Sequence, residues 1–460
     1  MTTSTSPTRK LAKLSALLLA LSLGAAACGA NGSADALSSA AETDDTAEGD
    51  TDDEGSADDD ESAATGDTTS VTVTIENIAD FAITDSGVFD TPVGAVEPGP
   101  ALPGDAYEFS FHASPGQRLS FATMFVQTND WFFAPNPDGV ELFDGDGTPI
   151  SGDITDQVLT FDAGTEIDQP VGTGADQAPR QSGPDTGDAD PDTSVREVPS
   201  AVASEYVAVV ITPGDDGRFD VRIENASGMQ MAPSPIAPGV YAVHSPEVAL
   251  FELGAPDAGH GLEALAEDGT AGPFAEYLSG LTGTPTPIAP GAWAVHGPDV
   301  ALYELGAPDA GAGHEGVAED GDPAALAETL AGLAGVDASG VFNTPDGATE
   351  PGPVLPGDSY TFEVPLVDGR LSFSTMFVQS NDWVFATPAE GLDLDDLEGD
   401  ITDRLLVVDI GTEVDQVPGF GLDQAPRQAG PDTGDADPEP NARIVEERSA
   451  ARYITVTVSR

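Results

Sequence analysis

Two short acidic motifs occur twice in this chain and supply residue types that bind hard metal ions. One is an Asn-Asp pair followed by tryptophan, and the other is Asp-x-Gly-Thr-Glu. Calcium takes roughly six to eight oxygen ligands, mostly carboxylates and carbonyls on turn-rich loops. If the two motifs meet at one end of a fold, each copy forms a calcium site. The candidate ligands are Asp130, Asp162 and Glu166 in the first copy and Asp382, Asp409 and Glu413 in the second.

The same residues also have a purely structural interpretation. An Asn-Asp pair often closes a turn by bonding its own backbone. In a chain with 81 Asp and Glu residues, acids also come together by chance. The sequence therefore leaves a calcium site and a simple turn as alternatives at Asp130 and Asp382.

A second acid-rich loop is also repeated, and it lacks the spacing and the final Glu of an EF-hand loop. A solvated surface loop is the simpler interpretation, and a loop stabilised by a cation is the alternative. Arg180 and Arg427 precede the two copies and are candidate partners for their acids. Those acids are Asp185, Asp188 and Asp190 in the first copy and Asp432, Asp435 and Asp437 in the second.

The histidines do not supply a zinc site, which takes about three or four ligands at suitable spacing. His244 and His296 each end an apolar segment and are followed by a small residue and proline. We interpret them as structural residues at the end of a strand. His260 and His314 lie in Gly-rich stretches, and we predict that they face solvent.

No catalytic arrangement is recognisable in the sequence. The only cysteine is Cys28, and the chain has no Gly-x-Ser-x-Gly elbow, Walker loop or His-Glu-x-x-His motif. Paired carboxylates of the kind used in glycoside hydrolysis stay possible in so acidic a chain, but no pair stands out. We therefore expect that the protein is not an enzyme.

The charge is strongly negative, because 81 Asp and Glu residues oppose 15 Lys and Arg residues, for a formal net charge of -66. Both lysines lie near the N-terminus, and the rest of the chain contains arginine but no lysine. Nucleic acids are excluded as partners because phosphate contacts require clustered Lys and Arg. The acidity fits solubility at high salt, a biased composition or a supply of cation ligands, and we favour the first two.

The N-terminus has the pattern of an export signal. Basic residues precede an apolar run over Leu14–Leu23, and small residues then lead to Cys28. Such a run is too short to span a bilayer, which takes about 20 residues. The pattern predicts a lipoprotein signal peptide over 1–27, with Cys28 acylated after cleavage, and an ordinary secretory signal is the alternative.

The segment after Cys28 is acidic and nearly free of large apolar residues, which predicts a disordered tether over 28–70. We expect an exported protein of the cell envelope, attached by its lipid to the outer face of a membrane. Like charges along the tether extend it and hold the folded part away from that membrane.

Beyond the tether, apolar and polar residues alternate with the period of half-buried strands, and turn residues separate these runs. Helical periodicity is convincing only over 261–268, 272–280 and 323–332. The pattern predicts a mostly β fold with a few short helices. The predicted strands include 71–76, 107–112, 119–127, 157–162, 206–212 and 218–224.

Internal repeats are the strongest pattern in the chain. The segment Leu119–Trp131 returns almost unchanged as Leu371–Trp383, and other segments return as well. These repeats predict two antiparallel β-sandwich modules, over 71–217 and 218–460.

A second repeat lies inside the second predicted module, where 234–283 and 286–335 carry the same motifs. The first predicted module has no such segment. We therefore predict a truncated first module and a second module with a duplicated segment.

In combination, these motifs resemble the spondin N-terminal domain family in its bacterial form. The resemblance covers about 218–460 fully and 70–215 in part. The residues that carry it are Ser234–His244, Gly261–Gly269, Leu355-Pro-Gly357, Leu371-Ser-Phe373, Thr375–Val378, Ser380–Phe385 and Asp409-Ile-Gly-Thr-Glu413 with its twin Asp162-Ala-Gly-Thr-Glu166.

The resemblance implies a β-sandwich similar to a C2 domain. In animal relatives such domains act in matrix attachment and adhesion, with a calcium ion held by loop carboxylates. Asp130 and Asp382 match the loop aspartate that precedes an aromatic residue in the family. The resemblance therefore also points to calcium at these two positions.

Taken together, these features predict a non-catalytic envelope lipoprotein for binding or adhesion, with calcium as its candidate cofactor and an extracellular glycan or protein as ligand. One alternative is a structural envelope protein without a specific ligand. The other is a secreted hydrolase on a β-sandwich scaffold.

Overall fold

The computed structural model describes residues 70–230 and 233–460. This part is mostly β, with 34% strand and 13% helix, and its antiparallel sheets form two similar sandwich-like modules. The predicted fold class is thereby confirmed. The predicted signal peptide, Cys28 and all but the last residue of the predicted tether lie outside the described residues. No helix in the described ranges has the length and the apolar composition that crossing a membrane requires.

The two modules are not consecutive in the sequence. One contains strands β2 to β12 with helices α1 and α2, and we call it the inserted module (83–281). The other, the outer module, consists of β1 together with everything from β13 onward (70–77 and 288–460). In sequence, the inserted module therefore interrupts the outer module after its first strand.

The inserted module is a sandwich of a four-stranded and a seven-stranded sheet. The smaller sheet contains, in spatial order, β3 (Ala106–His112), β11 (Arg218–Asn225), β10 (Val207–Pro213) and β7 (Gly152–Asp153). The larger contains β2 (Ile83–Phe89), β12 (Ile236–His244), β4 (Arg118–Phe125), β5 (Trp131–Pro135), β8 (Val158–Asp162) and β9 (Arg196–Glu197), with β6 (Val140–Glu141) paired to β4.

The outer module repeats this arrangement strand for strand. Its smaller sheet contains β15 (Ser359–Pro365), β1 (Ser70–Asn77), β22 (Ile454–Ser459) and β19 (Gly399–Asp400). Its larger sheet contains β14 (Val336–Phe342), β13 (Ile288–His296), β16 (Arg370–Phe377), β17 (Trp383–Ala386), β20 (Leu406–Asp409) and β21 (Arg443–Ile444), with β18 (Leu392–Asp393) paired to β16.

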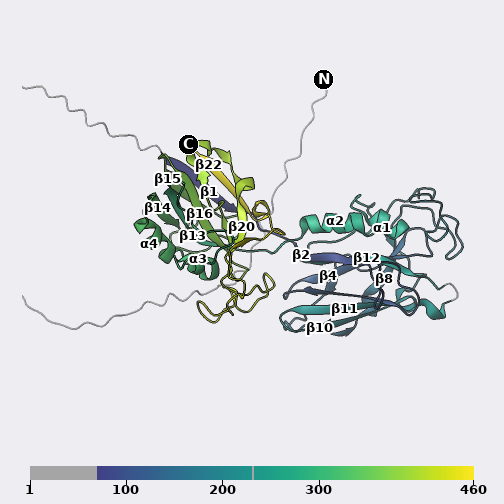
Figure 1. The fold of residues 1–460 in the computed structure, drawn as a ribbon. Coiled ribbons are helices and arrows are strands. Elements are labelled where there is room, and N and C mark those ends of the chain that lie inside the picture. The colour runs from purple at the N-terminus through teal and green to yellow at the C-terminus, as the bar shows by residue number, and fades with distance from the viewer. Residues whose placement is uncertain (1–69, 231–232) are drawn as a thin grey trace, which may run out of the picture. The chain divides into compact units, whose positions relative to one another are not determined.

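Strand β1 completes the smaller sheet of the outer module. It lies between β15 and β22, with Val73 opposite both Phe362 and Val458. In Figure 1 the purple β1 is visible among the green and yellow strands of that module. Its alternating pattern explains the fit, because Val71, Val73 and Ile75 are all buried against the sandwich core.

The predicted boundary between residues 217 and 218 is wrong. β11 pairs with β10 and β3, and β12 pairs with β2 and β4, so both complete the inserted module. Segment 234–283 forms β12, α1 and α2 there, whereas 286–335 forms β13, α3 and α4 of the outer module. Neither module is therefore truncated. Because β1 and β11 carry nearly the same strand pattern, the repeats do not reveal which of two similar sheets each strand joins.

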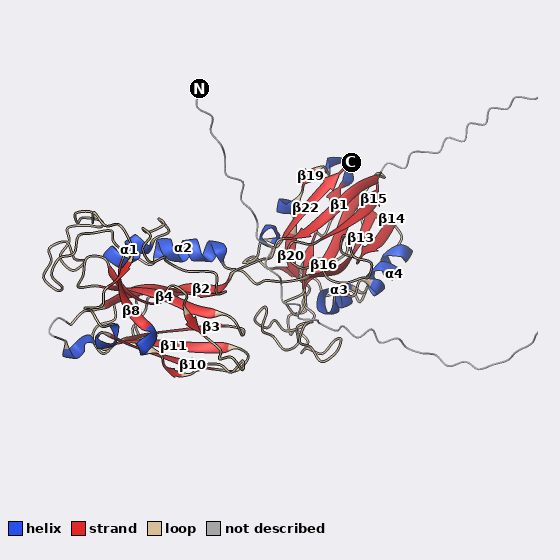
Figure 2. Cartoon of the chain, turned by 180° about the vertical axis from the view of Figure 1, so that it is seen from behind, coloured by secondary structure: helices blue, strands red, loops and turns tan. Residues whose placement is uncertain are grey.

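Each module has a third layer, formed by two helices on the outer face of the larger sheet (Figure 2). The central strands β4 and β16 are therefore buried on both faces, with every residue after the first arginine buried, including the serines and threonines. The helices are α1 (Leu262–Asp268), α2 (Gly272–Leu281), α3 (His314–Asp320) and α4 (Ala324–Gly332). Short 3-10 helices are η1 (Thr155–Gln157), η2 (Ala203–Glu205), η3 (Ser227–Met229), η4 (Leu394–Asp396), η5 (Thr402–Arg404) and η6 (Ala450–Arg452).

Helix α3 is absent from the expectations based on sequence, because its polar His314 and flexible Gly316 interrupt the helical pattern. Glycines define its limits instead. Gly313 precedes it with φ 97°, and a Cβ there would lie 2.5 Å from the backbone nitrogen of Leu326. Gly321 ends the helix with φ 65°. The close approach of α3 and α4 thus requires glycine at the start of α3.

Candidate metal sites

Acidic side chains meet at one end of the larger sheet in each module. β5 and β8 are neighbours, with Trp131 opposite Asp162, and Asp130 directly precedes β5. Asp168, in the loop after β8, joins the two acids. One carboxylate oxygen of each lies within 4.8 Å of the others. We call this cluster site I. Its counterpart in the outer module contains Asp382, Asp409 and Asp415, with the same proximity.

Asp130 is fully buried, and only one of its two carboxylate oxygens is paired. Its Oδ2 accepts hydrogen bonds from the backbone nitrogens of Thr165 (2.8 Å) and Glu166 (3.0 Å). Its Oδ1 is buried and has no hydrogen-bond partner among the described residues. Asp382 repeats both features, with the nitrogen of Thr412 at 2.6 Å. Each module thus holds one unsatisfied buried carboxylate oxygen at site I.

One arginine partly neutralises site I in each module. Asp162 Oδ1 accepts a hydrogen bond from the nitrogen of Gly164 (2.7 Å), and its Oδ2 pairs with Arg196. The same guanidinium reaches Asp190 at 2.7 Å. Arg443 has the same role in the outer module. More acids than bases therefore gather at this end of each sheet.

The excess of acids is reflected in the pKa values of site I. Burial, reinforced by the charge of Asp130, raises the pKa of Asp162 to about 7. In the outer module, burial raises the pKa of Asp382 to about 6. Burial and the charge of Asp382 also raise the pKa of Asp409. Each cluster holds more negative charge than its surroundings stabilise, so a cation or a proton would relieve it.

The asparagines of the two Asn-Asp pairs fasten the neighbouring loop. Asn129 Nδ2 donates to Glu166 Oε2 (3.0 Å), and its Oδ1 accepts a hydrogen bond from the nitrogen of Gln169 (3.0 Å). Asn381 makes the same bond to Glu413 (3.1 Å). These contacts reach a loop more than thirty residues further along the chain. The pairs therefore link two strand ends rather than closing their own turn.

The first two predicted acids of each copy come together, but the third does not join them. Glu166 and Glu413 point to the other side of the loop, where Asn129 and Asn381 hold them. Asp168 and Asp415 complete site I instead. The repeated motif extends to Asp-x-Gly-Thr-Glu-x-Asp in both copies. This repeated last aspartate is the signal by which both residues could have been found.

Glu166 belongs to a second acidic cluster, which we call site II. Its acids offer carboxylate oxygens within 4.8 Å of one another. Glu267, on α1, is 2% exposed, and its Oε2 is buried without a hydrogen-bond partner in the part of the chain that the structure describes. Burial, reinforced by the charge of Glu166, raises the pKa of Glu267 to about 8. Site II consists of Glu166, Asp185 and Glu267 in the inserted module and of Glu315, Glu319 and Asp432 in the outer module.

His244 and His296 are buried and structural in their contacts. His244 Nδ1 donates to the Ser245 carbonyl (2.8 Å), so its Nε2 accepts from the Ser120 hydroxyl (2.9 Å). His296 makes the same kind of bond to Ser372 (2.8 Å). Both rings link the end of a strand to the neighbouring strand, in agreement with the interpretation from the sequence.

The prediction for His314 is wrong. The ring is fully buried under α3, between the Leu302 carbonyl (3.2 Å) and the Ser374 hydroxyl (2.8 Å). Burial lowers the pKa of His314 to about 4, so the ring is neutral at physiological pH. His260 is exposed, as predicted, and stacks on Tyr277 with 3.8 Å between ring centroids. A Gly-rich flank therefore does not decide exposure, because the helix that follows turns its first residue toward the sheet.

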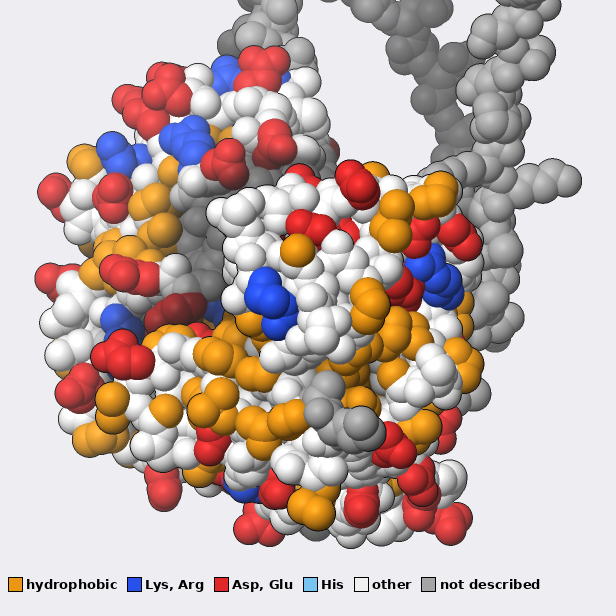
Figure 3. Space-filling view, turned by 90° about the vertical axis from the view of Figure 1, so that its right-hand side faces the viewer, with side chains coloured by type: hydrophobic (Ala, Val, Ile, Leu, Met, Phe, Trp, Pro, Cys, Tyr) orange, Lys and Arg blue, Asp and Glu red, His pale blue; other side chains and the backbone are white. Residues whose placement is uncertain are grey.

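Arg180 and Arg427 do not pair with the acid-rich loops. They donate instead to backbone carbonyls of their own loops, at Gly174 and Gly421. Asp and Glu side chains spread over the face shown in Figure 3, with few basic side chains between them.

A scan against models of known protein families finds no match, and a search of curated proteins finds no related sequence.

Proposed function

We propose that this chain is a non-catalytic binding or adhesion protein of the cell envelope, in which site I of each module holds a calcium ion. One observation carries this proposal. Asp130 and Asp382 are fully buried, yet one carboxylate oxygen of each has no hydrogen-bond partner within residues 70–230 and 233–460. An unpaired buried charge is strongly unfavourable, whereas coordination to a cation satisfies it. The same feature recurs in both modules.

The donor atoms support calcium over a transition metal. Site I offers carboxylate oxygens, and no histidine or cysteine belongs to either described cluster. Such oxygen donors suit hard cations, and calcium accepts irregular arrangements of them. Arg196 and Arg443 already neutralise part of the charge, which favours one ion in each cluster rather than two.

The position of site I supports a role in presenting a binding surface. The ion would bridge the start of β5, the end of β8 and the loop between Asp162 and Asp168. Fixing these loops reduces the conformational entropy that they would lose on binding a ligand. The resemblance to spondin domains points to the same use, with an extracellular glycan or protein as ligand. Cys28 would attach the chain to a membrane through lipid.

Burial favours binding over hydrolysis at site I. Asp130 is 0% exposed and Asp162 is 1% exposed. A hydrolase that uses two carboxylates must admit the scissile bond and a water molecule between them. These two side chains leave no such access, whereas the third acid of the cluster, Asp168, is exposed and would admit an ion from solvent.

Thermal unfolding of the full chain in calcium and in chelator tests this proposal. An ion bound only to the folded state contributes about 2.7 kcal/mol at a concentration of 100 times its Kd, which shifts the midpoint upward. We expect this shift to become smaller at one module in Asp130→Asn and at the other in Asp382→Asn. Asp156→Asn and Asp403→Asn are matched controls, because these aspartates are exposed at equivalent positions of η1 and η5.

An unchanged midpoint in calcium would contradict the metal part of the proposal. Binding to immobilised glycans and matrix proteins, measured with calcium and with chelator, tests the adhesion part. We expect retention only with calcium, and less of it in Asp130→Asn. Equal retention under both conditions would leave adhesion independent of site I.

A further inference from the structure

We propose that site II is a second divalent-cation site, distinct from site I and present once in each module. In the inserted module its ligands come from three separate segments. Glu166 lies after β8, Asp185 in the acid-rich loop and Glu267 on α1. One carboxylate oxygen of each lies within 4.8 Å of the other two. Such a cation would join the helix layer to two points of the long connection between β8 and β9.

The unpaired oxygen of Glu267 distinguishes site II from an ordinary group of surface acids. The side chain is 2% exposed, and its Oε2 is buried with no hydrogen-bond partner in the described part of the chain. Glu319, at the equivalent position of α3, has the same exposure and the same unpaired Oε2. A buried acceptor left unpaired is unfavourable, and more so if it is charged. Both modules therefore keep an unfavourable group that a cation would satisfy.

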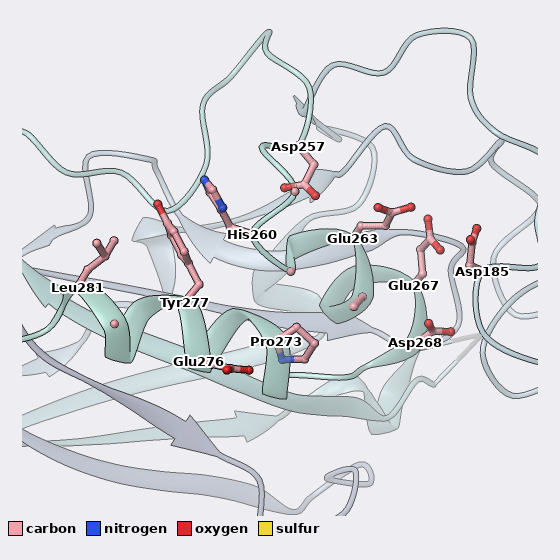
Figure 4. Close-up of a pocket in the computed structure, with 14 residues that line it drawn as sticks. Asp185, Asp257, His260, Glu263, Glu267, Asp268, Pro273, Glu276, Tyr277 and Leu281 are labelled. Atoms are coloured by element: carbon pink, nitrogen blue, oxygen red, sulfur yellow. The ribbon is translucent and has the colours of Figure 1, made fainter. Parts of the chain in front are cut away.

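Site II has no arginine, in contrast to site I. None of the ion pairs formed by the described residues includes Glu166, Asp185 or Glu267. Glu263 adds a further carboxylate, four residues before Glu267 and hence on the same face of α1. Figure 4 shows Glu263 and Glu267 on one side of the helix, with Asp185 beside Glu267. A positive charge at this point would have to come from solution.

The neighbouring backbone holds Glu166 in place for this role. The nitrogen of Gly187 donates to Glu166 Oε1 at 2.6 Å, and Asn129 donates to Oε2. A Cβ at position 187 would lie 2.2 Å from Glu166 Cδ, so a larger residue there would displace this carboxylate. Gly434 and Glu413 repeat the arrangement in the outer module, with a distance of 2.3 Å, but the cluster there contains Glu315, the counterpart of Glu263, in place of Glu413. Each carboxylate oxygen keeps a further lone pair for a metal ion.

The ion would be accessible and incompletely coordinated by the protein. In the inserted module, Asp185, Glu263 and Glu267 line an open pocket of about 730 Å³. His260 and Tyr277 line the same pocket. Calcium takes roughly six to eight oxygens, more than these side chains supply. Water or an oxygen-rich ligand in the pocket would complete the coordination.

Counting bound calcium by equilibrium dialysis of the full chain tests this inference. We expect the double variant Glu267→Gln/Glu319→Gln to bind one ion fewer per module than the wild type. Asp156→Asn/Asp403→Asn removes the same charge from exposed positions of η1 and η5, outside this pocket, and is expected to bind as many ions as the wild type. Equal counts for the two double variants would overturn the inference.

The two sites are separated by their own variants. Asp130→Asn/Asp382→Asn should remove the site I ions and leave those of site II. If bound ions are lost in this pair of variants but not in Glu267→Gln/Glu319→Gln, the proposal of site II would be overturned and that of site I would be supported. The reverse pattern would support site II and contradict the proposed function of site I.

Melting in chelator shows whether the glutamine variants fold. We expect midpoints at or above that of the wild type, because each substitution removes an unpaired buried carboxylate. If they melt lower, Asp185→Asn/Asp432→Asn provides the second test, because both aspartates are exposed. We expect the same loss of ions from this pair, and an unchanged count would again overturn the inference.

Discussion

The two modules solve one packing problem in different ways, at the point where the first helix meets the larger sheet. In the outer module His314 lies there and bonds Ser374, on β16. In the inserted module the same positions hold Leu262 and Ala122, which are both buried in an apolar cluster. The polar residues thus occur together or not at all. A buried polar group is tolerated only with its hydrogen-bond partner. The positions of His314 and Ser374 must therefore both be polar or both be apolar.

The same comparison separates what repeats from what varies. Both modules keep the unpaired oxygens of sites I and II, although each costs stability in the absence of an ion. By contrast, the stacked pair His260 and Tyr277 has no equivalent, because Ala312 and Thr329 occupy those positions. The acids are therefore common to both modules, and the aromatic wall of the pocket belongs to the inserted module alone.

The largest effect is expected from charges placed in β1 and β11. Val73 in β1 and Val221 in β11 are equivalent, and both are buried. Val73→Asp should unfold the outer module and Val221→Asp the inserted one, each at a cost of more than about 4 kcal/mol, because a charge is buried without a partner. Hydrogen exchange of peptides from β16 and β4 reports the two modules separately.

This result is the opposite of the one expected if each strand belonged to the module nearest to it in the sequence. That order places β1 with the first module and β11 with the second. If Val73→Asp exposed β4 and left β16 protected, the exchange of strands between modules would be contradicted. Val210→Asp, at an exposed position of β10, controls for the added charge alone.

A smaller effect is expected from exchanging the polar pair for the apolar one. His314→Leu leaves the Ser374 hydroxyl without its partner, and Ser374→Ala leaves the imidazole without its donor. Each should cost about 1–3 kcal/mol. The double variant restores the pair found in the inserted module and should cost less than the sum of the two. A coupling energy of about 1–2 kcal/mol, measured by thermal or denaturant unfolding, would support this explanation. Strict additivity would contradict it.

The smallest effect is expected from pH, through His244. Burial lowers the pKa of His244, with a further decrease from Arg118 and an opposing effect of Glu247. The unfolded chain therefore takes up the proton first. The contribution of His244 is fully present above the unfolded pKa of about 6.5 and is lost as the pH falls through that value toward the lower folded pKa.

Comparison of the wild type with His244→Gln isolates this contribution, because the acids and His112, whose pKa is also lowered, are common to both chains. We expect the midpoint of the inserted module to fall more steeply below about pH 6.5 in the wild type than in the variant. Parallel curves would show that the ring does not titrate during unfolding.

Much of the local structure follows from the sequence alone. The alternation around Val73 determines a strand with one buried face, and the glycines that flank α1 allow its tight start and end. The repeats establish two similar sandwiches. The motifs also put Asp130 just before one strand and Asp162 at the end of another. Residues at such ends lie close together when the two strands pair in antiparallel fashion.

Only the tertiary structure decided which module each strand completes, because β1 and β11 present nearly the same surface to similar sheets. It also decided which acids share a site. The backbone after Asp162 donates hydrogen bonds to Asp130. As a result, the side chain of Glu166 contacts Asn129, whereas that of Asp168 lies in site I. The direction of a side chain in a loop depends on backbone hydrogen bonds to residues far along the chain. A local pattern of residues contains no information on those bonds.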